Sequence, residues 1–572
     1  MDTNKRLPNF EKVTQVMSVL SLFMVLLISG CAESSQDNEP TAKIVCDSDN
    51  GGITLPDGFC ASVVVDSIGP ARHMAVADNG DIYVKTRSEK GGVITLRDTT
   101  GDFQADIIEY FSDMTEMSQG IVWETGMAIH NGYIWASNKQ EVYRWEMPQN
   151  GALVPEGEPE IIVSGFPDQW AHASKSIEFD GKGNLYVNVG SPSNNCQQDP
   201  RTPGSSGIDP CPQLEQHAGI WRFSAKETGQ TFSPEARYAT GLRNVVGLDW
   251  NSEVEALYVM QHGRDQLNTL WPDLYTEEEN AELPAEEMYR LSEGADAGWP
   301  YCYYDWQQEK KVLAPEYGGD GQMVGRCSEF LDPVAAFPGH WAPNGLLFYA
   351  GEHFPERYQG GAFVAFHGSW NRAPLPQQGY KVTFTPFEEG TPTGDYETFA
   401  DGFAGTEPIP DRGAAEYRPM GLAIGPDGAL FISDSKKGKI WRVVYTGKET
   451  AEAETSDSVQ EDTSQAVAEN TNANSSLSGE ELFQQLTCHT CHAVNPDDGT
   501  SSTAPALYDY YGSEVTLQGG STVTADDEYI RESILNANAK VVEGYMLVMP
   551  NYESQLTEEE VDLLLSYIKS LS

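Results

Sequence analysis

Residues 421–432 read Gly-Leu-Ala-Ile-Gly-Pro-Asp-Gly-Ala-Leu-Phe-Ile. Two short apolar runs flank an Asp-Gly turn, and this arrangement is typical of a β-hairpin. Five similar stretches precede it, several of them with Asn-Gly, Asp-Gly or Gly-Asn turns. They cover residues 73–84, 126–136, 177–187, 247–259 and 345–365.

Six hairpin units between residues 51 and 446 correspond to roughly 65 residues per unit, which suits propeller blades that carry long loops. The sequence therefore predicts an all-β, six-bladed β-propeller over residues 51–446. A pair of β-sandwiches is the alternative. Because the copies are unequally spaced, we expect the largest insertions between the third and the sixth copy, where long loops usually carry function.

The chain is strongly acidic. Its 572 residues contain 36 Lys and Arg against 86 Asp and Glu, which gives a formal net charge of −50. Such a chain is not expected to bind nucleic acid by neutralising phosphates, and an anionic membrane surface would repel it. Any attachment to a membrane must therefore be hydrophobic or covalent.

The first 31 residues have the layout of a bacterial lipoprotein signal peptide. Basic residues precede an apolar run over 17–28, which is too short for a comfortable transmembrane span. The run ends Leu27-Ile-Ser-Gly-Cys31, which resembles a lipobox, so we expect Cys31 to be acylated. With Ala32 next, we expect an exported protein on the periplasmic side, held by lipid alone at the outer membrane. An ordinary signal peptide with an incidental cysteine is the alternative.

Two polar segments divide the rest of the chain. Residues 32–50 are predicted to be a tether. Residues 447–477 are rich in Glu, Asp, Ser, Thr, Asn and Ala, and this composition predicts a flexible acidic linker because it cannot bury a core. The linker separates the propeller from a second domain at residues 478–572.

Residues 478–572 have the helical periodicity of a small all-α domain. Ser478-Gly-Glu-Glu481 is a capping box that opens a first helix. Thr524 is predicted to begin a second helix that runs to Leu535. Thr557 is predicted to cap a third helix, with apolar residues at 561, 564, 565 and 568.

The most specific motif of the chain is Cys488-His-Thr-Cys-His492, because Cys-x-x-Cys-His attaches c-type haem. Cys488 and Cys491 would bond to the porphyrin, and His492 would bind the iron. No His follows His492, so we expect a Met as the second axial ligand. The segment resembles a small class I cytochrome c, whose axial Met lies in a loop before the last helix, and this favours Met549 over Met546. A thioredoxin-like motif or a zinc site is the alternative.

Six of the nine cysteines remain once Cys31 and the haem pair are set aside. They form three sequence-local pairs, and in an exported protein such an even set predicts disulfide bonds. A zinc site would need tighter Cys-x2–4-Cys spacing. The expected bonds are Cys46–Cys60, Cys196–Cys211 and Cys302–Cys327.

Five short stretches within residues 51–446 carry a resemblance to a known family. They are Leu55-Pro-Asp-Gly-Phe59, Gly241-Leu-Arg-Asn244 with Gly247-Leu, Gly298-Trp-Pro-Tyr301, His367-Gly-Ser-Trp-Asn-Arg372 and Arg418-Pro-Met-Gly-Leu. They resemble the soluble quinoprotein sugar dehydrogenases, in particular the sorbosone and pyranose dehydrogenase branch. The resemblance implies a six-bladed propeller that holds pyrroloquinoline quinone (PQQ) and calcium on its top face.

PQQ is a flat tricarboxylate with an ortho-quinone, so an acidic protein must supply local cations to bind it. Arg suits this role because its planar fork grips a carboxylate at two points, although a surface ion pair is the alternative for any single Arg. Asn244 is expected to hydrogen-bond the cofactor edge, and Arg264 and Arg412 are weaker candidates. The expected cofactor-binding arginines are Arg72, Arg243, Arg372 and Arg418.

Oxidation of a sugar hydroxyl also needs a base. His172 lies in residues 170–176, Trp-Ala-His-Ala-Ser-Lys-Ser, where the family places its catalytic His. An imidazole suits proton transfer near neutral pH. His367 and His73 are alternative bases, and a structural role is the alternative for His172. The family branch commonly has an Arg shortly after this His, whereas this chain has Lys175.

The resemblance also implies a calcium ion, which would act as a Lewis acid on the quinone oxygen. In related glucose dehydrogenases backbone carbonyls donate much of its shell. Residues 261–265, Gln-His-Gly-Arg-Asp, lie at the corresponding loop. The carbonyls of Gly263 and Arg264 are therefore the expected calcium ligands.

Together these features predict a quinohaemoprotein dehydrogenase of a small sugar. His172 would take the hydroxyl proton, and electrons would pass through PQQ to the haem and on to another cytochrome or a terminal oxidase. One alternative is PQQ-dependent oxidation of an alcohol or of a sugar polymer end. Another is a non-catalytic propeller that binds a carbohydrate or a protein partner, with a cytochrome that only relays electrons.

Overall fold

A computed structural model describes the chain from residue 46 onward, with gaps. The predictions for the signal peptide with Cys31, for most of the tether and the linker, and for Cys491 and Met549 lie outside the described residues. The gaps are 88–91, 112–124, 448–478, 480–481, 484–487, 489–491, 496–503, 519, 536–539, 546–557 and 572, together with the side chains of 528 and 558–560.

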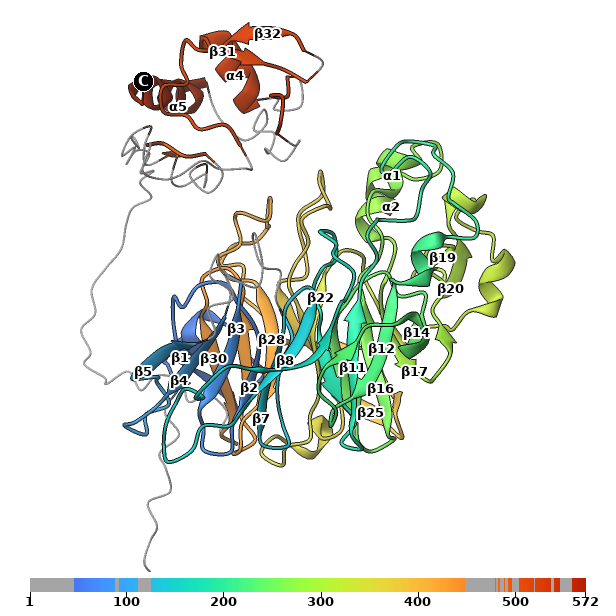
Figure 1. The fold of residues 1–572 in the computed structure, drawn as a ribbon, viewed down its shortest axis with the longest axis vertical. Helices are drawn as coiled ribbons and strands as arrows, with labels where there is room; N and C mark the ends of the chain where they lie inside the picture. The colour runs from blue at the N-terminus through green and yellow to red at the C-terminus, as the bar shows by residue number, and fades with distance from the viewer. Residues whose placement is uncertain are drawn as a thin grey trace, which may run out of the picture. The chain divides into compact units, whose positions relative to one another are not determined.

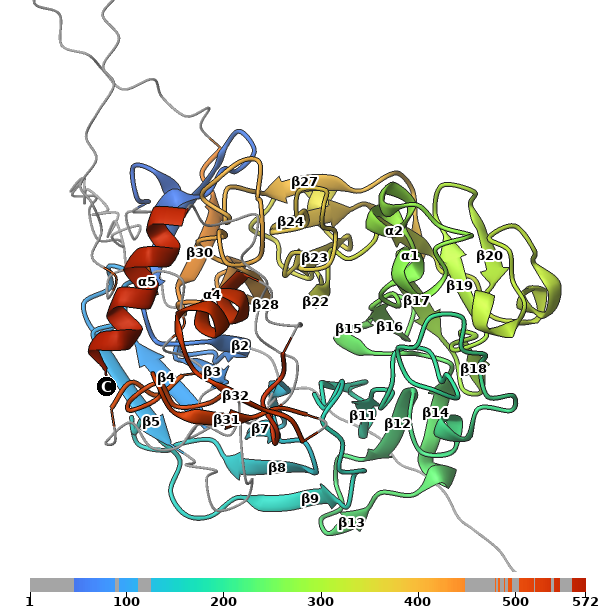
Figure 2. The ribbon, with the colours of Figure 1, turned by 90° about the horizontal axis from the view of Figure 1, so that it is seen from above.

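Six antiparallel sheets form the propeller, and Figure 2 shows them arranged around a common centre. The first strand of each sheet lies next to the first strands of the neighbouring sheets. Two of the sheets gain a short fifth strand in parallel. The first three sheets are β2 (Ala71–Val76), β3 (Ile82–Thr86), β4 (Val93–Arg97) and β5 (Ile107–Phe111); β6 (Met127–His130), β7 (Tyr133–Ser137), β8 (Glu141–Glu146) and β9 (Glu160–Ser164) with β13 (Gln230–Thr231); and β10 (Ile177–Phe179), β11 (Asn184–Val189), β12 (Gly219–Ser224) and β14 (Arg237–Thr240) with β18 (Ala295–Asp296).

The last sheet is completed by a strand from the start of the chain. Strand β1 pairs with β30, so that Phe59 lies opposite Tyr445. The Phe59 ring packs edge-on against Phe354 and Phe399. This pairing closes the ring of blades, and the repeats did not predict it because they begin after β1. The last three sheets are β15 (Val245–Asn251), β16 (Ala256–Gln261), β17 (Glu286–Leu291) and β21 (Ala335–Phe337); β22 (Pro343–Phe348), β23 (Ala362–Phe366), β24 (Lys381–Thr385) and β27 (Glu397–Ala400); and β28 (Pro419–Ile424), β29 (Leu430–Asp434), β30 (Ile440–Tyr445) and β1 (Phe59–Val65).

The six sequence repeats are the innermost hairpins of the six blades. The copy at residues 73–84 covers β2 and β3, and the copy at 421–432 covers β28 and β29. Apolar side chains of facing sheets pack between the blades, as Trp135 of β7 does in one cluster with Val187 of β11 and Trp221 of β12. The predicted six-bladed propeller is confirmed, and the alternative of two sandwiches is wrong.

The long insertions lie between the third and the sixth copy, as predicted, and the largest of them stand at one side of the propeller in Figure 1. They carry short elements and not a second sheet domain. These elements are α1 (Leu267–Leu270), α2 (Glu277–Glu282), the hairpins β19 (Cys302–Asp305) with β20 (Lys310–Leu313) and β25 (Phe387–Glu388) with β26 (Thr391–Pro392), and 3-10 helices at Pro212–Glu215, Pro234–Ala236, Pro315–Tyr317, Gly325–Glu329 and Glu356–Tyr358; a further 3-10 helix, Asn50–Gly52, precedes β1.

All three predicted disulfides are present. Cys46–Cys60 ties the segment before the propeller to β1. Cys196–Cys211 closes the insertion between β11 and β12, and Cys302–Cys327 closes the insertion that carries β19 and β20. The last two bonds therefore stabilise the insertions of the third and fourth blades.

The described part of the C-terminal domain contains two long helices and a short hairpin. The hairpin was not predicted, because the sequence analysis expected an all-α domain. Neither these helices nor any other described helix is both long and apolar enough to cross a membrane. The elements are β31 (Glu514–Thr516), β32 (Thr522–Thr524), α4 (Asp527–Leu535) and α5 (Glu558–Ser570).

Helix α4 begins three residues later than predicted. Thr524 ends β32, and the carboxylate of Asp526 accepts the backbone N–H of Tyr529 at 3.0 Å as the N-cap. The predicted apolar faces pack together: Tyr529 and Ile530 of α4 join Leu564 of α5 in one buried cluster with Phe483. This core holds the segment that carries the haem motif.

Candidate functional site

The predicted cofactor residues lie at one end of the propeller strands. Neighbouring strands are antiparallel, so the first strand of a blade begins at the end where the second strand stops. Arg72 is at the start of β2, Asn244 directly precedes β15, and Arg418 directly precedes β28. His367 follows the end of β23. The fold thus brings together residues from four blades.

Seven cationic or imidazole side chains at this end act electrostatically on one another. Burial lowers the pKa of each, and in most of them the charge of a neighbouring Arg lowers it further. Most of them are only partly buried, so the group borders solvent. We call it the arginine–histidine cluster, and its members are Arg72, Arg87, His172, Arg243, His262, His367 and Arg418.

Arg72 is buried and carries an unused donor. Its Nη2 donates to Thr125 Oγ1 at 3.2 Å, and Thr125 in turn donates to Ser174 Oγ at 2.9 Å. Its Nε is buried and has no hydrogen-bond partner among the described residues. Burial, followed by the charges of Arg87 and Arg418, lowers the pKa of Arg72 to about 9. A buried, unsatisfied donor on a cation that other cations repel indicates a place for an anion.

Arg418 spans the loop of the neighbouring blade. Its Nε donates to the carbonyl of His367 at 2.9 Å and its Nη2 to that of Gly368 at 2.6 Å. Burial lowers the pKa of Arg418 to about 10. Within the described part of the chain, neither Arg418 nor Arg72 forms an ion pair with a carboxylate. Their charges therefore suit a ligand that brings its own carboxylates.

His172 lies in the turn before β10, with Nδ1 2.7 Å from the carbonyl oxygen of Ser191. A carbonyl only accepts, so Nδ1 carries the proton and Nε2 keeps its lone pair. Burial and then the charge of Arg243 lower the pKa of His172 to about 3, so the ring is neutral at neutral pH. The side chain is partly exposed. A fixed, neutral imidazole with an open lone pair can accept a proton from a bound hydroxyl.

The loop around His172 is tightly held. The side-chain amide of Gln169 donates to three carbonyls, those of Ala171, His172 and Gly190. A Cβ at Gly190 would lie 2.6 Å from His172 Cβ and 3.2 Å from Asn244 Oδ1. Asn244 Oδ1 is itself buried and unpartnered among the described residues. Asn244 is thus beside His172, with an acceptor to offer a ligand.

The other histidines of this end are also anchored through one ring nitrogen. Nε2 of His73 lies 2.8 Å from the carbonyl oxygen of Asn344, and Nε2 of His262 lies 3.2 Å from that of Pro343. Burial above all lowers the pKa of each to about 4. His367 Nε2 hydrogen-bonds Ser435 Oγ. All three rings are therefore neutral. Each is held by one hydrogen-bonded nitrogen, as His172 is, so none is better arranged than His172 to act as the base.

Arg243 is saturated by the protein. Its guanidinium donates to Asn194 at two atoms, to the carbonyl of Gly263 at 2.8 Å and to Asp265 Oδ2 at 3.0 Å. Burial raises the pKa of Asp265, but the charge of Arg243 and of other neighbours lowers it, and the result is a pKa of about 2. Arg243 therefore lies in the cluster as predicted, but most of its hydrogen-bonding capacity orders the surrounding loops.

The structure places Arg372 in a different role from the one predicted. Its side chain is 1% exposed and donates to the carbonyls of Pro376 and Ala281 and to Glu282 Oε1 at 2.6 Å. These contacts tie the loop after β23 to helix α2. The motif correctly placed Arg372 near the site. Its guanidinium, however, which was expected to bind the cofactor, is hydrogen-bonded to neighbouring residues of the protein.

The expected calcium ligands lie in the loop after β16, where one of the two carbonyls already accepts a hydrogen bond. The carbonyl of Gly263 accepts a hydrogen bond from Arg243, and a guanidinium at this oxygen opposes a divalent cation beside it. The side chain of Arg264 is buried in an ion pair with Glu316. No three His, Cys, Asp or Glu side chains in the described ranges are grouped to hold a metal. Neither of the last two observations concerns backbone carbonyls, so Gly263 and Arg264 as calcium ligands stay a prediction.

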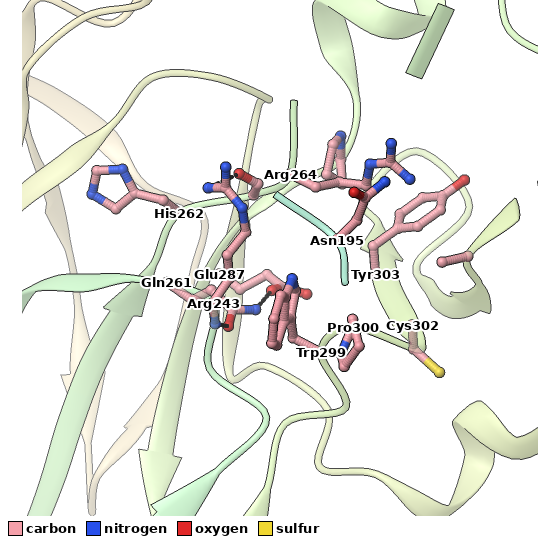
Figure 3. A pocket seen from close by; sticks show the side chains of 13 residues that line it. Asn195, Arg243, Gln261, His262, Arg264, Glu287, Trp299, Pro300, Cys302 and Tyr303 are labelled. Carbon is pink, nitrogen blue, oxygen red and sulfur yellow. Dashed lines mark hydrogen bonds between the residues drawn. The ribbon is translucent and has the colours of Figure 1, made fainter. Parts of the chain in front are cut away.

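A small cavity lies beside the cluster, between β16 and the insertion with β19. Figure 3 shows Arg243, Arg264, Trp299 and Tyr303 around it, whereas the ring of His262 points away from the group. The cavity is too small for a cofactor and holds about one water molecule. It therefore belongs to the packing of the insertion against the blade, and not to a ligand site.

Lys175 does not replace the arginine that the family branch has near this position. It is fully buried, and its Nζ donates to the carbonyl of Ala173 at 2.8 Å. Burial lowers the pKa of Lys175 to about 7, and the charges that act on it are those of Asp168 and Lys139. No member of the arginine–histidine cluster is among the charges that act on this amine.

In the C-terminal domain His492 is arranged as an iron ligand would be. Its Nδ1 lies 2.7 Å from the carbonyl oxygen of Pro505, so Nδ1 donates and Nε2 keeps its lone pair. Burial lowers the pKa of His492, which favours the neutral ring that a metal binds. The backbone N–H of His492 donates to the carbonyl of Cys488 in the same motif. These residues fit a c-type haem, and the predictions for Cys491 and Met549 remain predictions.

Sequence reasoning missed Arg87 at this end of the propeller, and it gave His262 and Asp265 no role of their own although it placed residues 261–265 in the expected calcium loop. Each follows the second strand of a blade, Arg87 after β3 and the other two after β16. The repeats contained a usable signal, because every second strand of a propeller blade ends on the same side. A polar residue directly after such a strand is therefore a candidate wherever it occurs in the repeat.

A six-bladed propeller with a cation-rich end, followed by a helical domain with a c-type haem motif, defines a two-domain propeller–cytochrome protein. The family model described as TrAA12-like matches residues 53–446, and a cytochrome c family model matches residues 476–572. Because the first match covers more than half of the sequence, the chain belongs to the TrAA12-like family, with a cytochrome c domain at its C-terminus.

Named relatives and solved structures agree with this assignment. A PQQ-dependent pyranose dehydrogenase of Coprinopsis cinerea is 26% identical over 279 residues, which cover 42% of this chain and 36% of that protein. The calcium structure of a Trichoderma reesei protein of family AA12 has a TM-score of 0.55 at 19% identity and covers 69% of this chain and 97% of its own. The holo form of the pyranose dehydrogenase PQQ domain from Coprinopsis cinerea has a TM-score of 0.52 at 19% identity, covering 68% and 97%. At these identities the structural likeness concerns the fold.

Proposed function

We propose that this protein is a PQQ-dependent dehydrogenase of small sugars that passes electrons to its own haem c. The observation that carries the proposal is the pair of guanidinium groups, Arg72 and Arg418, that have no carboxylate partner among the described residues. In a chain with a net charge of −50, buried arginines without a described ion-pair partner are unusual and indicate that a ligand supplies the negative charge. A ligand with several carboxylates supplies the missing charge.

The residues of the cluster fit such a ligand. Arg72 offers a buried Nε donor, and Arg418 donates to the carbonyl of His367. Asn244 offers a buried acceptor beside His172. PQQ, when bound, would supply a two-electron oxidant at this position, and the haem would supply a one-electron acceptor.

His172 is the proposed base. Its Nε2 accepts the proton of the substrate hydroxyl, and the contact of Nδ1 with Ser191 fixes the ring orientation. A low pKa in the absence of ligand keeps Nε2 unprotonated over the whole neutral range. After burial, the charge of Arg243 is the main cause of this low pKa, so a carboxylate ligand that bound near Arg243 would make His172 a stronger base.

The location and the partners of the protein are part of the proposal. The signal-like segment ending at Cys31 supports export and a lipid anchor on the periplasmic side of the outer membrane. From His492 and its haem, electrons would continue to another cytochrome or to a terminal oxidase. A small sugar is the proposed substrate, in keeping with the name of the pyranose dehydrogenase relative.

The test is anaerobic addition of a panel of aldoses to the full-length, haem-containing protein loaded with PQQ, while the haem spectrum is recorded. Reduction of the haem by one or more sugars is expected. The H172A variant should bind PQQ nearly as well but reduce the haem about 10²–10⁴-fold more slowly. The matched control is H130A, because His130 stacks on Phe179 outside the cluster, and its rate should not change. Absence of haem reduction with every sugar would rule out the proposed function.

A further inference from the structure

The loop from His367 to Arg372 holds every one of its side chains against the protein except one. Ser369 is fully buried, and its hydroxyl donates to Gln377 Oε1 at 2.7 Å. Arg372 is bound to the loop of α2, as described above. Trp370 in contrast is 52% exposed. An indole that is this exposed loses apolar burial, so its position in an ordered loop needs a reason.

The backbone of the loop is rigid. The N–H groups of His367 and Gly368 donate to the carbonyls of Ala342 and Trp341, both at 2.9 Å. Gly368 has φ +87°, and a Cβ there would meet the Tyr380 ring at 2.4 Å. The hydroxyl of Tyr380 donates to the carbonyl of the next residue in the loop, Ser369. The indole of Trp370 is therefore presented on a fixed frame, which lowers the entropy lost when a ligand binds to it.

Both flanks of Trp370 border the arginine–histidine cluster. On one side, Arg418 donates to the carbonyl of His367 at 2.9 Å and to that of Gly368 at 2.6 Å. On the other side, Asn371 Nδ2 donates to Asp265 Oδ1 at 2.7 Å, and Asp265 also pairs with Arg243. The loop is thus tied to both halves of the cluster, with the indole between the two ties.

We propose that Trp370 is the sugar-binding platform of this site: its indole stacks on the C–H face of a pyranose ring, and Asn371 is the positioning residue that holds it there. This inference rests on the proposed function and adds to it the residue that binds the ring of the sugar through its apolar face. A pyranose presents such a face between its hydroxyl groups, and an exposed aromatic ring recovers apolar burial when the two stack. The anchor through Asn371 fixes the indole relative to Asp265 and Arg243 without contacting the sugar itself.

The test uses the full-length, PQQ-loaded protein and a small soluble dye as electron acceptor. The W370A variant should raise the KM for the best sugar about 10-fold with kcat within about twofold, and W370F should raise it about threefold because a ring remains. PQQ affinity should not change. The matched control is Y110A, because Tyr110 is 68% exposed on the outer strand β5 of another blade. An unchanged KM in W370A, or a loss of PQQ, would overturn the proposal.

The role of Asn371 has its own readout. N371A should raise KM about threefold, and the double variant N371A/W370A should be no worse than W370A, because the anchor acts only through the indole. Fully additive effects would show that Asn371 contacts the sugar or the cofactor directly. If W370A slows haem reduction but leaves the dye-coupled KM unchanged, the indole receives the haem domain and not the sugar, and the proposal falls.

Sugar binding is also measured without turnover, so that the two proposals fail separately. Calorimetric titration of sugar into PQQ-loaded H172A and H172A/W370A should give a dissociation constant about 10-fold higher in the double variant. If the wild-type protein oxidises no sugar but this difference is found, the platform stands and the proposed dehydrogenase activity falls. If both proteins bind sugar equally, the platform falls whatever the activity.

Discussion

Arg372 and Arg418 lie at the same end of the propeller, in the loops after β23 and before β28, and both belong to motifs that predicted a carboxylate-binding arginine. Arg372 donates to Glu282 and to three backbone carbonyls, and it ties two loops together. Arg418 donates to two carbonyls and forms no ion pair with a described carboxylate. Arg372 is a structural cation in an ion pair, and Arg418 is a cation without an ion pair among the described residues.

The difference shows which buried charges mark a ligand site. A buried ion pair with its hydrogen bonds satisfied is stable when left intact and costly when broken from one side. A buried cation beside other cations is a charge that the protein has not balanced by itself. The burial of a guanidinium therefore does not by itself indicate a cofactor site. A buried guanidinium that has no carboxylate partner does indicate one.

The largest effect that separates the two is on stability. The R372Q variant should lower the free energy of unfolding by about 3 kcal/mol, because Glu282 and the carbonyl of Ala281 lose their donor. Denaturant unfolding measures this, and the PQQ affinity of the protein that remains folded should be close to that of wild type. A large loss of PQQ affinity without a loss of stability would return Arg372 to the cofactor site.

The second effect is on cofactor affinity. The R418Q variant should weaken PQQ binding about 10–100-fold, because a charge-assisted contact is lost. Its unfolding free energy should change by no more than about 1 kcal/mol, since two carbonyl contacts are lost but a cation repelled by its neighbours is removed. PQQ titration against haem-containing apoprotein measures the affinity. Equal PQQ binding by R418Q and wild type would contradict a role of Arg418 in cofactor binding.

The smallest effect is on the pH dependence of stability. Burial, and then the charge of Arg418, holds the pKa of His367 well below its usual range. A histidine whose pKa is lower in the folded state stabilises the fold above about pH 6.5, and this contribution is lost as the pH falls toward the folded pKa. R418Q removes one cause of the shift, so the loss of stability that begins below about pH 6.5 should end at a higher pH than in wild type, and the total fall in melting temperature on acidification should be smaller.

The control for this pH series is R372Q. Arg372 is not among the main charges that lower the pKa of His367, although its charge lowers the pKa of His340. A part of the acid sensitivity of about 1 kcal/mol or less should disappear in R418Q and persist in R372Q. Parallel curves for wild type and R418Q would mean that burial alone sets the pKa of His367.

Much of the fold could be predicted because the repeats are local. The Asp-Gly turn at residues 427–428 and its flanking apolar runs indicate one hairpin, and six such hairpins in a row indicate six blades. The disulfides could be predicted for the same reason, since the paired cysteines are neighbours in the sequence. The closing strand β1 could not, because its partner β30 is nearly 400 residues away and no local pattern marks the pairing.

The candidate site could also be predicted in part, where a local motif specifies the chemistry, but not where it depends on distant residues. The motif of Cys488 and His492 specifies haem chemistry within five residues, and the resemblance of several loops pointed to a common end of the propeller. The resemblance could not show which of these arginines already have their hydrogen-bond and ion-pair partners within the protein. That depends on Glu282 for Arg372 and on Asp265 for Arg243, and both partners come from distant loops.

By itself, the sequence determined the number of blades, the haem motif, the disulfide pairs and the family to which the propeller belongs, because each of these is written in neighbouring residues. Only the tertiary structure decided which buried cations are compensated, that the carbonyl of Gly263 faces Arg243, and that one indole of a rigid loop remains exposed. The physical reason is that charge balance and exposure are sums over everything that surrounds a side chain, and most of those surroundings arrive from elsewhere in the chain.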